Sequence, residues 1–192
     1  MLKGFQSEIF DSQAIFRKVL DAMANPGKIM EMPIELAPPE GMDTAAGAIL
    51  MTLLDFETPL WSNLDHDSAG IQWLRFHTGT PFTRVKKNAA FALCTDYDRL
   101  GNPKDFSPGT IESPQESTTL IVQTRGIDER TSLRLTGPGI QTHAHLKLTG
   151  VPHQFFQQRA QIFSTYPLGV DMIFVCDTIF VAIPRTTLLE VL

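Results

Sequence analysis

Residues 166–185 read YPLGVDMIFVCDTIFVAIPR, and this stretch decides the fold. Two nearly continuous apolar runs, rich in Val, Ile and Phe, flank the turn-forming residues Cys176-Asp177-Thr178. Such runs predict paired strands buried on both faces, because strands with one wet face alternate apolar and polar residues. Pro184 cannot donate to a ladder, so it ends the second strand. Arg185 is then expected at the strand mouth, the edge where open α/β sheets usually bind ligands.

Amphipathic segments elsewhere supply the helices that a buried sheet needs. Helices are predicted over about 11–24, 44–54, 67–78 and from 152 onward. In the first, the residues expected to face the core are Ile15, Phe16, Val19, Leu20 and Met23. In the last, they are Phe155, Phe156, Arg159, Ile162 and Phe163.

Short strands are predicted between these helices, at 28–32, 60–61, 89–95, 118–123, 132–136 and 143–148. Asp128-Glu129-Arg130 is predicted to be a turn, and 96–117 a long irregular segment. Because this order mixes crossovers with hairpins, the sequence predicts an α/β fold, a three-layer α/β/α sandwich with a mixed sheet. One domain is expected to span residues 1–192.

The composition is that of a globular chain with a large core. With 192 residues, 43% hydrophobic, the chain needs no disulfide to hold a core, and Cys94 and Cys176 are expected to be free thiols. A net charge of −5 argues against nucleic acid or an anionic membrane as partner, since binding phosphate needs clustered Lys and Arg. No leader or spanning segment is recognised, so a cytoplasmic location is expected.

Arg75-Phe76-His77-Thr78, at the end of a predicted helix, is the most suggestive polar cluster. Its guanidinium, imidazole and hydroxyl groups can converge on a carboxylate or phosphate, and Asp55 and Glu57 follow the preceding helix. In the structural alternative, Arg75 pairs with one of these acids and His77 binds helix carbonyls.

Asp171 and Arg185 allow the same two interpretations, because Pro184 gives Arg185 a fixed place at a strand end. The candidate ligand or partner contacts are therefore Asp55, Glu57, Arg75, His77, Thr78, Asp171 and Arg185.

Recognisable catalytic motifs are missing from the sequence. It contains neither G-x-S-x-G nor H-E-x-x-H, so no catalytic residue is assigned. His143 and His145 would share one face of a strand, but a third metal ligand is missing nearby, so solvated edge histidines are favoured and no metal site is assigned. In Gly137-Pro138-Gly139 the proline removes one of the amides that a phosphate cradle would use, so a tight turn is favoured over an anion nest.

Taken together, several segments resemble the PhnH family, the H subunit of the carbon–phosphorus (C–P) lyase core complex. No single segment is specific, but their combination runs through the whole chain in the family's order. The matching segments are 16–27 (ending ANPG), 53–61 (LLDFETPLW), 74–79 (LRFHTG), 119–122 (TLIV), 133–140 (LRLTGPGI), 167–171 (PLGVD) and 183–187 (IPRTT).

The resemblance implies a fold similar to the large domain of transferases that depend on pyridoxal phosphate (PLP), but without PLP. An internal aldimine needs a lysine facing the sheet site, whereas every lysine here falls on a predicted loop, an exposed helix face or an edge. The resemblance also implies a complex that transfers an alkylphosphonate onto the ribose of MgATP and releases adenine. In that complex the H subunit is needed with G, I and L-type subunits and associates with G, I and J types.

This chain is then expected to be a structural subunit of a transferase complex, without catalytic groups of its own. A Phe-rich chain with two buried strand runs is expected to leave an apolar patch for a partner, and in isolation that patch would close on a second copy as a homodimer. The alternative is an independent anion- or nucleotide-binding domain or enzyme that uses Arg75, His77 and Arg185.

Overall fold

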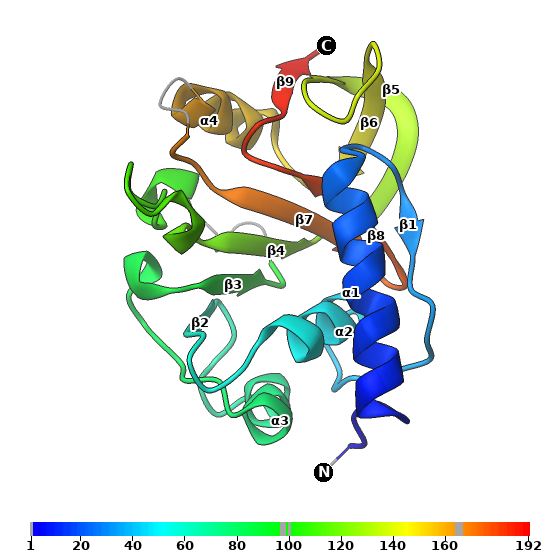
Figure 1. Ribbon diagram of the computed structural model, residues 1–192, viewed down its shortest axis with the longest axis vertical. Helices are drawn as coiled ribbons and strands as arrows, with labels where there is room; N and C mark the ends of the chain where they lie inside the picture. Colours follow the sequence, from blue (N-terminus) through cyan, green and yellow to red (C-terminus); the bar gives the residue numbers. More distant parts are fainter. Residues whose placement is uncertain (1, 97–98, 100, 164–166) are drawn as a thin grey trace.

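A six-stranded mixed sheet forms the centre of the molecule (Figure 1), in the order β1-β8-β7-β4-β3-β2. The computed structural model describes residues 2–96, 99, 101–163 and 167–192, and no side chain from 160 to 163. β2, β3, β4 and β7 run parallel, while β8 and β1 are antiparallel to their neighbours, which confirms the predicted mixed sheet. The strands are β1 (Met30–Glu31), β2 (Leu60–Ser62), β3 (Phe91–Cys94), β4 (Thr119–Gln123), β7 (Asp171–Cys176) and β8 (Ile179–Ile183).

The decisive stretch forms the hairpin β7–β8. Cys176 pairs with Ile179 across a two-residue turn, in which Asp177 has a φ of 52°. Residues 172–175 and 180–183 are all buried, as their continuous apolar character predicts. Because β7 also pairs in parallel with β4, the hairpin joins the parallel strands to the antiparallel edge of the sheet.

Three helices cover one face of the sheet: α1 (Glu8–Ala24), α2 (Thr44–Leu53) and α3 (Ala69–Thr78). Their inner residues form one core cluster with alternate strand residues such as Ile121 and Ile173. α1 begins three residues before the predicted start, and at this end the Asp11 carboxylate accepts a hydrogen bond from the Ser7 N–H at 2.9 Å. No helix within the described ranges is long and apolar enough to cross a membrane.

A second sheet and one helix cover the opposite face. β5 (Gly126–Thr136) lies between β6 (Ala144–Thr149) and β9 (Leu188–Val191) in an antiparallel sheet, and α4 (His153–Phe163) packs beside β9. The predicted sandwich is therefore correct in covering both faces of a mixed sheet. It is wrong about the second outer layer, which is largely a sheet. Within α4, Phe155, Phe156 and Arg159 are buried as predicted, whereas the side chains of Ile162 and Phe163 lie outside the described residues.

One predicted turn is part of a strand, whereas the predicted irregular segment 96–117 is irregular in its described residues. Residues 128–130 lie inside β5 at an irregularity in its pairing, where the Arg130 side chain pairs with Asp128 at 2.7 Å and lowers the pKa of that carboxyl to about 2. The predicted irregular segment 96–117 buries Phe106, whose ring meets Trp61 edge-on at 5.4 Å between centroids. The short 3₁₀ helices are η1 (Lys86–Asn88), η3 (Pro103–Asp105) and η4 (Pro114–Glu116).

Candidate functional site

The last turn of α3 carries the predicted cluster Arg75–Thr78. Ser68 caps the start of the helix by accepting a hydrogen bond from the Ile71 N–H, and Gly79 ends the helix in the left-handed conformation with a φ of 72°. These caps confirm the predicted boundaries. They leave Arg75 and Phe76 exposed to solvent.

His77 and Thr78 both contact backbone carbonyls. His77 Nε2 lies 3.2 Å from the Leu2 carbonyl oxygen, which also accepts a hydrogen bond from the Trp73 indole at 3.2 Å. The Thr78 hydroxyl donates to the Leu74 carbonyl at 2.8 Å. His77 therefore fastens the N-terminal arm, residues 2–7, to α3 and has a structural task that the sequence did not reveal.

Asp55 and Glu57 lie in the loop after α2, and neither forms an ion pair with Arg75 within the described part of the chain. Asp55 Oδ1 accepts hydrogen bonds from the Glu57 N–H at 2.9 Å and from the Thr58 hydroxyl at 3.0 Å. Asp55 thus holds its own turn. The predicted pairing of Arg75 with these acids is not observed.

Two phenylalanines lie among these charged residues and face solvent. Phe56 is 75% exposed and Phe76 is 67% exposed. The loop with Phe56 packs against the end of α3, since a Cβ at Gly79 would lie 3.7 Å from the Phe56 Cβ. Exposed aromatic rings with neighbouring charges are typical of an interaction surface, not of an enclosed catalytic site.

Asp171 and Arg185 form a nearly buried ion pair, with side chains 13% and 16% exposed. The backbone N–H of Arg185 donates a hydrogen bond to the Asp171 carboxylate at 2.7 Å, and its Nε donates to the same carboxylate at 3.2 Å. Nη1 donates to the Pro114 carbonyl at 2.5 Å. Nη2 donates both to Asp171 and to the Ser117 hydroxyl. Every guanidinium nitrogen therefore has a protein acceptor. The pair joins β7 to the segment before β4.

The position of Arg185 corrects a second expectation. Because β8 runs antiparallel to β7, the end of β8 lies where the parallel strands begin. Ligands of open α/β sheets bind at the opposite edge, where parallel strands end. The prediction that Arg185 stands at the ligand-binding edge is wrong for this reason.

A second arginine, Arg159 of α4, is buried nearby and only 3% exposed. Its Nη1 donates to the Thr187 carbonyl at 2.8 Å and its Nη2 to the Pro184 carbonyl at 2.6 Å. Burial lowers the pKa of Arg159 to about 10. Arg159 and Arg185 therefore hold the loop between β8 and β9 from two sides.

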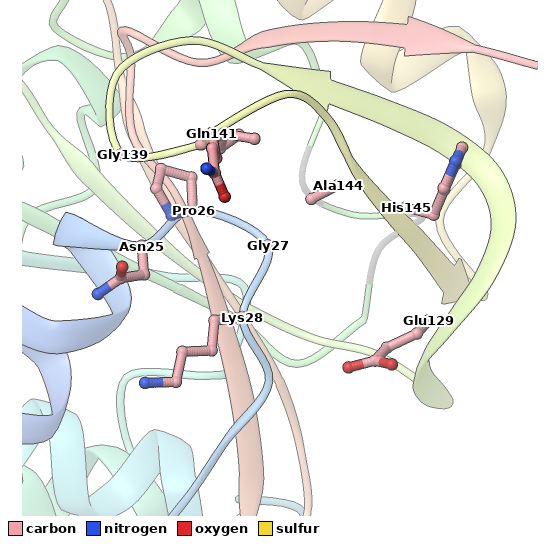
Figure 2. A pocket seen from close by; sticks show the side chains of 10 residues that line it. Asn25, Pro26, Gly27, Lys28, Glu129, Gly139, Gln141, Ala144 and His145 are labelled. Atoms are coloured by element: carbon pink, nitrogen blue, oxygen red, sulfur yellow. The ribbon is translucent and has the colours of Figure 1, made fainter.

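A hollow of about 530 Å³ opens beside the end of α1 (Figure 2). Its walls are the turn 25–28, Glu129 of β5 and the connection from Gly139 to β6. A Cβ at Gly139 would come within 2.1 Å of a carbonyl oxygen of α1, so this close approach requires glycine. Figure 2 shows the Lys28 side chain directed away from Glu129, and its amine binds Asp21 at 3.0 Å.

The histidines at this hollow do not assemble a metal site. The ring centroids of His143 and His145 lie 4.9 Å apart, and His145 Nδ1 is buried without a hydrogen-bond partner among the described residues. No group of three potential metal ligands forms anywhere in the described ranges. Because the Lys28 amine already binds Asp21 and the Glu129 carboxylate lies apart from it, the hollow favours no particular class of ligand.

The outer face of α1 is apolar, and no described segment covers it. Ile9 is 79% exposed, Phe16 46% and Leu20 52%. With Gln13, which is exposed, and Met23 these residues recur at alternating steps of four and three, the spacing of the contact positions in a coiled coil. Met23 is half-buried and also packs against the core, as predicted. We call these five residues the α1 seam: Ile9, Gln13, Phe16, Leu20 and Met23.

The seam overturns the prediction that Phe16 and Leu20 face the core. α1 buries a narrower face, made of Ile15, Val19 and Ala22, against α2 and β8. The apolar residues of α1 cover a wider arc of the helix than this buried face. Phe16 and Leu20 therefore remain exposed to solvent.

Comparison with known proteins assigns the family. A family model described as "Bacterial phosphonate metabolism protein (PhnH)" matches residues 3–190. The chain belongs to the PhnH family. This confirms the resemblance read from the sequence, which likewise runs through the whole chain.

Two relatives agree with the PhnH assignment. The subunit PhnH of alpha-D-ribose 1-methylphosphonate 5-triphosphate synthase from Rhizobium meliloti (strain 1021) is 33% identical over 188 residues, which is 97% of this chain and 94% of the relative. The putative C-P lyase subunit protein HtxG from Stutzerimonas stutzeri is 30% identical over 177 residues, 91% of this chain and 84% of the relative.

Three of the segments that carry the PhnH resemblance meet in space. Gly139 lies against the end of α1, and a Cβ at Gly137 would lie 2.9 Å from the Thr186 carbonyl oxygen. Segments 16–27, 133–140 and 183–187 thus pack at one place. The glycines there serve close packing between turns.

Proposed function

We propose that this PhnH-family chain is a subunit of the complex that transfers an alkylphosphonate onto the ribose of MgATP, with release of adenine, to give ribose 1-phosphonate 5-triphosphate. It acts in the cytoplasm with G, I and L-type subunits and contributes surfaces for assembly, not catalytic groups. The names of its relatives, a ribose 1-methylphosphonate 5-triphosphate synthase subunit and a putative C-P lyase subunit, support this proposal.

The α1 seam is the observation that carries the proposal. Coiled-coil spacing of large apolar side chains on an exposed helix face favours a second helix or an apolar groove as its partner. Gln13 at a central seam position would fix the register of that contact, as single polar residues do in coiled coils. In the complex the occupant is a G, I or J-type subunit. In isolation it is the seam of a second copy, related by a two-fold axis in a homodimer.

The engagement of the polar candidates inside the chain also supports an assembly role. His77 contacts the N-terminal arm, Asp55 holds a turn, and Arg185 is surrounded by its own acceptors. A catalytic group must reach a substrate atom. Groups already used by the fold are poorly placed to do so.

We further propose that the fold derives from the large domain of PLP-dependent transferases and has no PLP. Lys86 is mostly buried, and its amine lies 5.1 Å from the Trp61 ring centroid and 3.2 Å from Asp105. These contacts hold the amine against groups of its own chain, which leaves it poorly placed to attack an aldehyde. Incubation with PLP should give no new absorbance above the protein band and no product with borohydride. A borohydride-stable adduct on Lys86 would contradict this proposal.

Co-purification tests the assembly role. The chain is co-expressed with the G, I and J-type subunits in three forms: wild type, the seam variant Phe16→Glu/Leu20→Glu, and a control. The control is Gln154→Glu/Gln157→Glu, which adds the same charge at exposed positions of α4. Wild type and the α4 control should co-purify with the complex. The seam variant should be lost from the complex while it still folds cooperatively, because about half of each substituted side chain is exposed in the single chain.

Activity of the assembled complex separates assembly from catalysis. Arg75→Ala and His77→Ala should keep both co-purification and most of the growth on phosphonate as the phosphorus source. Loss of all turnover by either variant, with folding and assembly intact, would overturn the non-catalytic role. Retention of the seam variant in the complex would overturn the docking face.

A further inference from the structure

A polar hollow of about 370 Å³ lies at the edge where the parallel strands end. No sequence motif marks its polar residues. They end β4, follow β3 and β4, or open α2. The polar side chains that line it are Asp43, Thr95, Asp96, Gln123, Thr124 and Arg125.

The strand connections explain why a crevice forms here. The hollow lies between the start of α2, which packs on one face of the sheet, and the connections leaving β3 and β4, which place Phe106 and Ile127 in the core cluster on the other face. Segments that part to opposite faces in this way leave a crevice at the carboxyl ends of the strands, the usual ligand position in open α/β sheets. Asn63, after β2, accepts a hydrogen bond from the Thr95 N–H at 2.8 Å and so fixes the backbone at Thr95.

Hydrogen bonds fix the walls of the hollow. Gln123 accepts a hydrogen bond from the Asp43 N–H at 3.0 Å and donates to the Gly41 carbonyl at 3.1 Å. The Thr124 hydroxyl donates to the Val175 carbonyl at 3.0 Å. Side chains held in this way are oriented before a ligand arrives, so less entropy is lost on binding.

The charges on these walls select the kind of ligand. Asp43 is half-buried and accepts a hydrogen bond from the Asp177 N–H at 3.1 Å, and Asp96 is a second carboxylate, 3.7 Å from the Arg99 guanidinium outside the lining. Among the lining residues two carboxylates stand beside one guanidinium, that of Arg125, and this disfavours phosphate because like charges repel. Ligand hydroxyl groups suit these side chains, because a hydroxyl can donate a hydrogen bond to a carboxylate and accept one from Arg125. Acidic side chains at this edge bind the hydroxyls of ribose in dinucleotide-binding folds.

We propose that this hollow binds the ribose ring of the synthase's reactants through its vicinal hydroxyls, with the phosphates left in solvent. The inference rests on the proposed function, which supplies a ribose-containing substrate. The volume of the hollow lies at the small end of the ~300–1,000 Å³ that is typical of ligand sites, and this suits a single sugar ring. The hollow therefore has a binding role in a chain that otherwise contributes assembly surfaces.

Titration followed by amide NMR tests the site directly. Methyl β-D-ribofuranoside is added to the isolated protein at millimolar concentrations, with the matched 2-deoxyriboside as the competing probe. The amides of Thr95, Thr124, Arg125 and Gly150 should shift with the riboside. Loss of a hydrogen bond to a charged acceptor weakens binding about tenfold, and that is the expected loss for the 2-deoxyriboside.

Substitutions then assign the effect to the carboxylates. Asp43→Asn and Asp96→Asn should each weaken riboside binding about tenfold. Asp67→Asn, whose side chain is 96% exposed away from the hollow, should leave binding unchanged. If one Asn variant fails to fold, the other still decides, because the two carboxylates come from different segments.

The outcomes distinguish this inference from the proposed function. No shift at these amides, equal shifts with the 2-deoxyriboside, or undiminished binding by both Asn variants would overturn the ribose site while leaving co-purification intact. Riboside binding by a chain that fails to co-purify with the other subunits would instead overturn the proposed assembly role alone.

Discussion

The edge of the sheet where the parallel strands begin, here called the amino edge, differs from the outer face of α1 in what its side chains contact. At the amino edge, the terminal nitrogens of Arg159 and Arg185 bind protein acceptors, so these charges close the fold. On α1, Ile9, Phe16 and Leu20 face solvent. The charges at the first place serve the fold, whereas the exposed apolar surface at the second is the proposed docking face.

The largest expected effect comes from breaking the Arg185 pair. Arg185→Ala leaves Asp171 nearly buried without its counter-charge, so the free energy of unfolding should fall by about 3 kcal/mol in urea titrations. Arg185→Lys should recover only part of this loss, because an ammonium group cannot reach both Asp171 and the Pro114 carbonyl. If Arg185→Ala kept full stability and lost ATP binding in calorimetry, Arg185 would be an anion clamp and the comparison would fail.

Replacing Arg159 should have a smaller effect. Arg159→Met removes two hydrogen bonds to buried carbonyls but also removes a charge that burial disfavours, so we expect a loss of about 2 kcal/mol. The control is Arg134→Met, since Arg134 is 46% exposed and contacts Glu190 only at 3.6 Å. That control should change stability by less than about 0.5 kcal/mol. Equal losses from both variants would show that burial does not distinguish these arginines.

The contact between His77 and the N-terminal arm should be weaker again. His77→Ala removes one of two hydrogen bonds to the Leu2 carbonyl, so stability should fall by about 1 kcal/mol. Hydrogen exchange of the arm amides should become faster while exchange in α4 stays the same. Unchanged exchange in the arm, with a loss of phosphonate growth, would point instead to a role of His77 at a partner or ligand.

The smallest expected effect concerns Asp43. Burial raises the pKa of Asp43, so ionising this carboxyl group is less favourable in the folded chain than in the unfolded chain. The free energy of unfolding should therefore fall as the pH rises from the usual carboxyl range through the raised pKa of Asp43. Asp43→Asn stays neutral and keeps an oxygen for the Asp177 N–H. It should therefore be slightly more stable than wild type near pH 7 and lose this advantage in acid, as thermal melts across pH would show. The opposite trend would mean that the ionised carboxylate stabilises the fold.

The fold was largely predictable because its strands are continuous apolar runs. The β7–β8 hairpin, β3 and β4 follow from residues that can only be buried. β9 was missed because Leu188–Val191 is short and becomes a strand only by pairing with β5. The edge at which Arg185 lies was mistaken because strand direction within a sheet is a tertiary property.

The candidate surfaces were less predictable, for a related reason. The spacing of Phe16 and Leu20 shows that α1 has a wide apolar arc, but only the packed structure shows how much of that arc α2 and β8 cover. The bond from His77 to Leu2 spans 75 residues, and the carboxyl-edge hollow unites residues from 43 to 150. No local pattern records such contacts.

Sedimentation velocity of the purified chain tests the central claim most directly, because the α1 seam should join two copies when no other subunit is present. We expect wild type to sediment as a dimer that dissociates on dilution. Phe16→Glu/Leu20→Glu should sediment as a folded monomer whose melting temperature does not depend on protein concentration. A wild-type monomer at every concentration, or a seam variant that still dimerises like wild type, would contradict the assignment of this face as the docking surface.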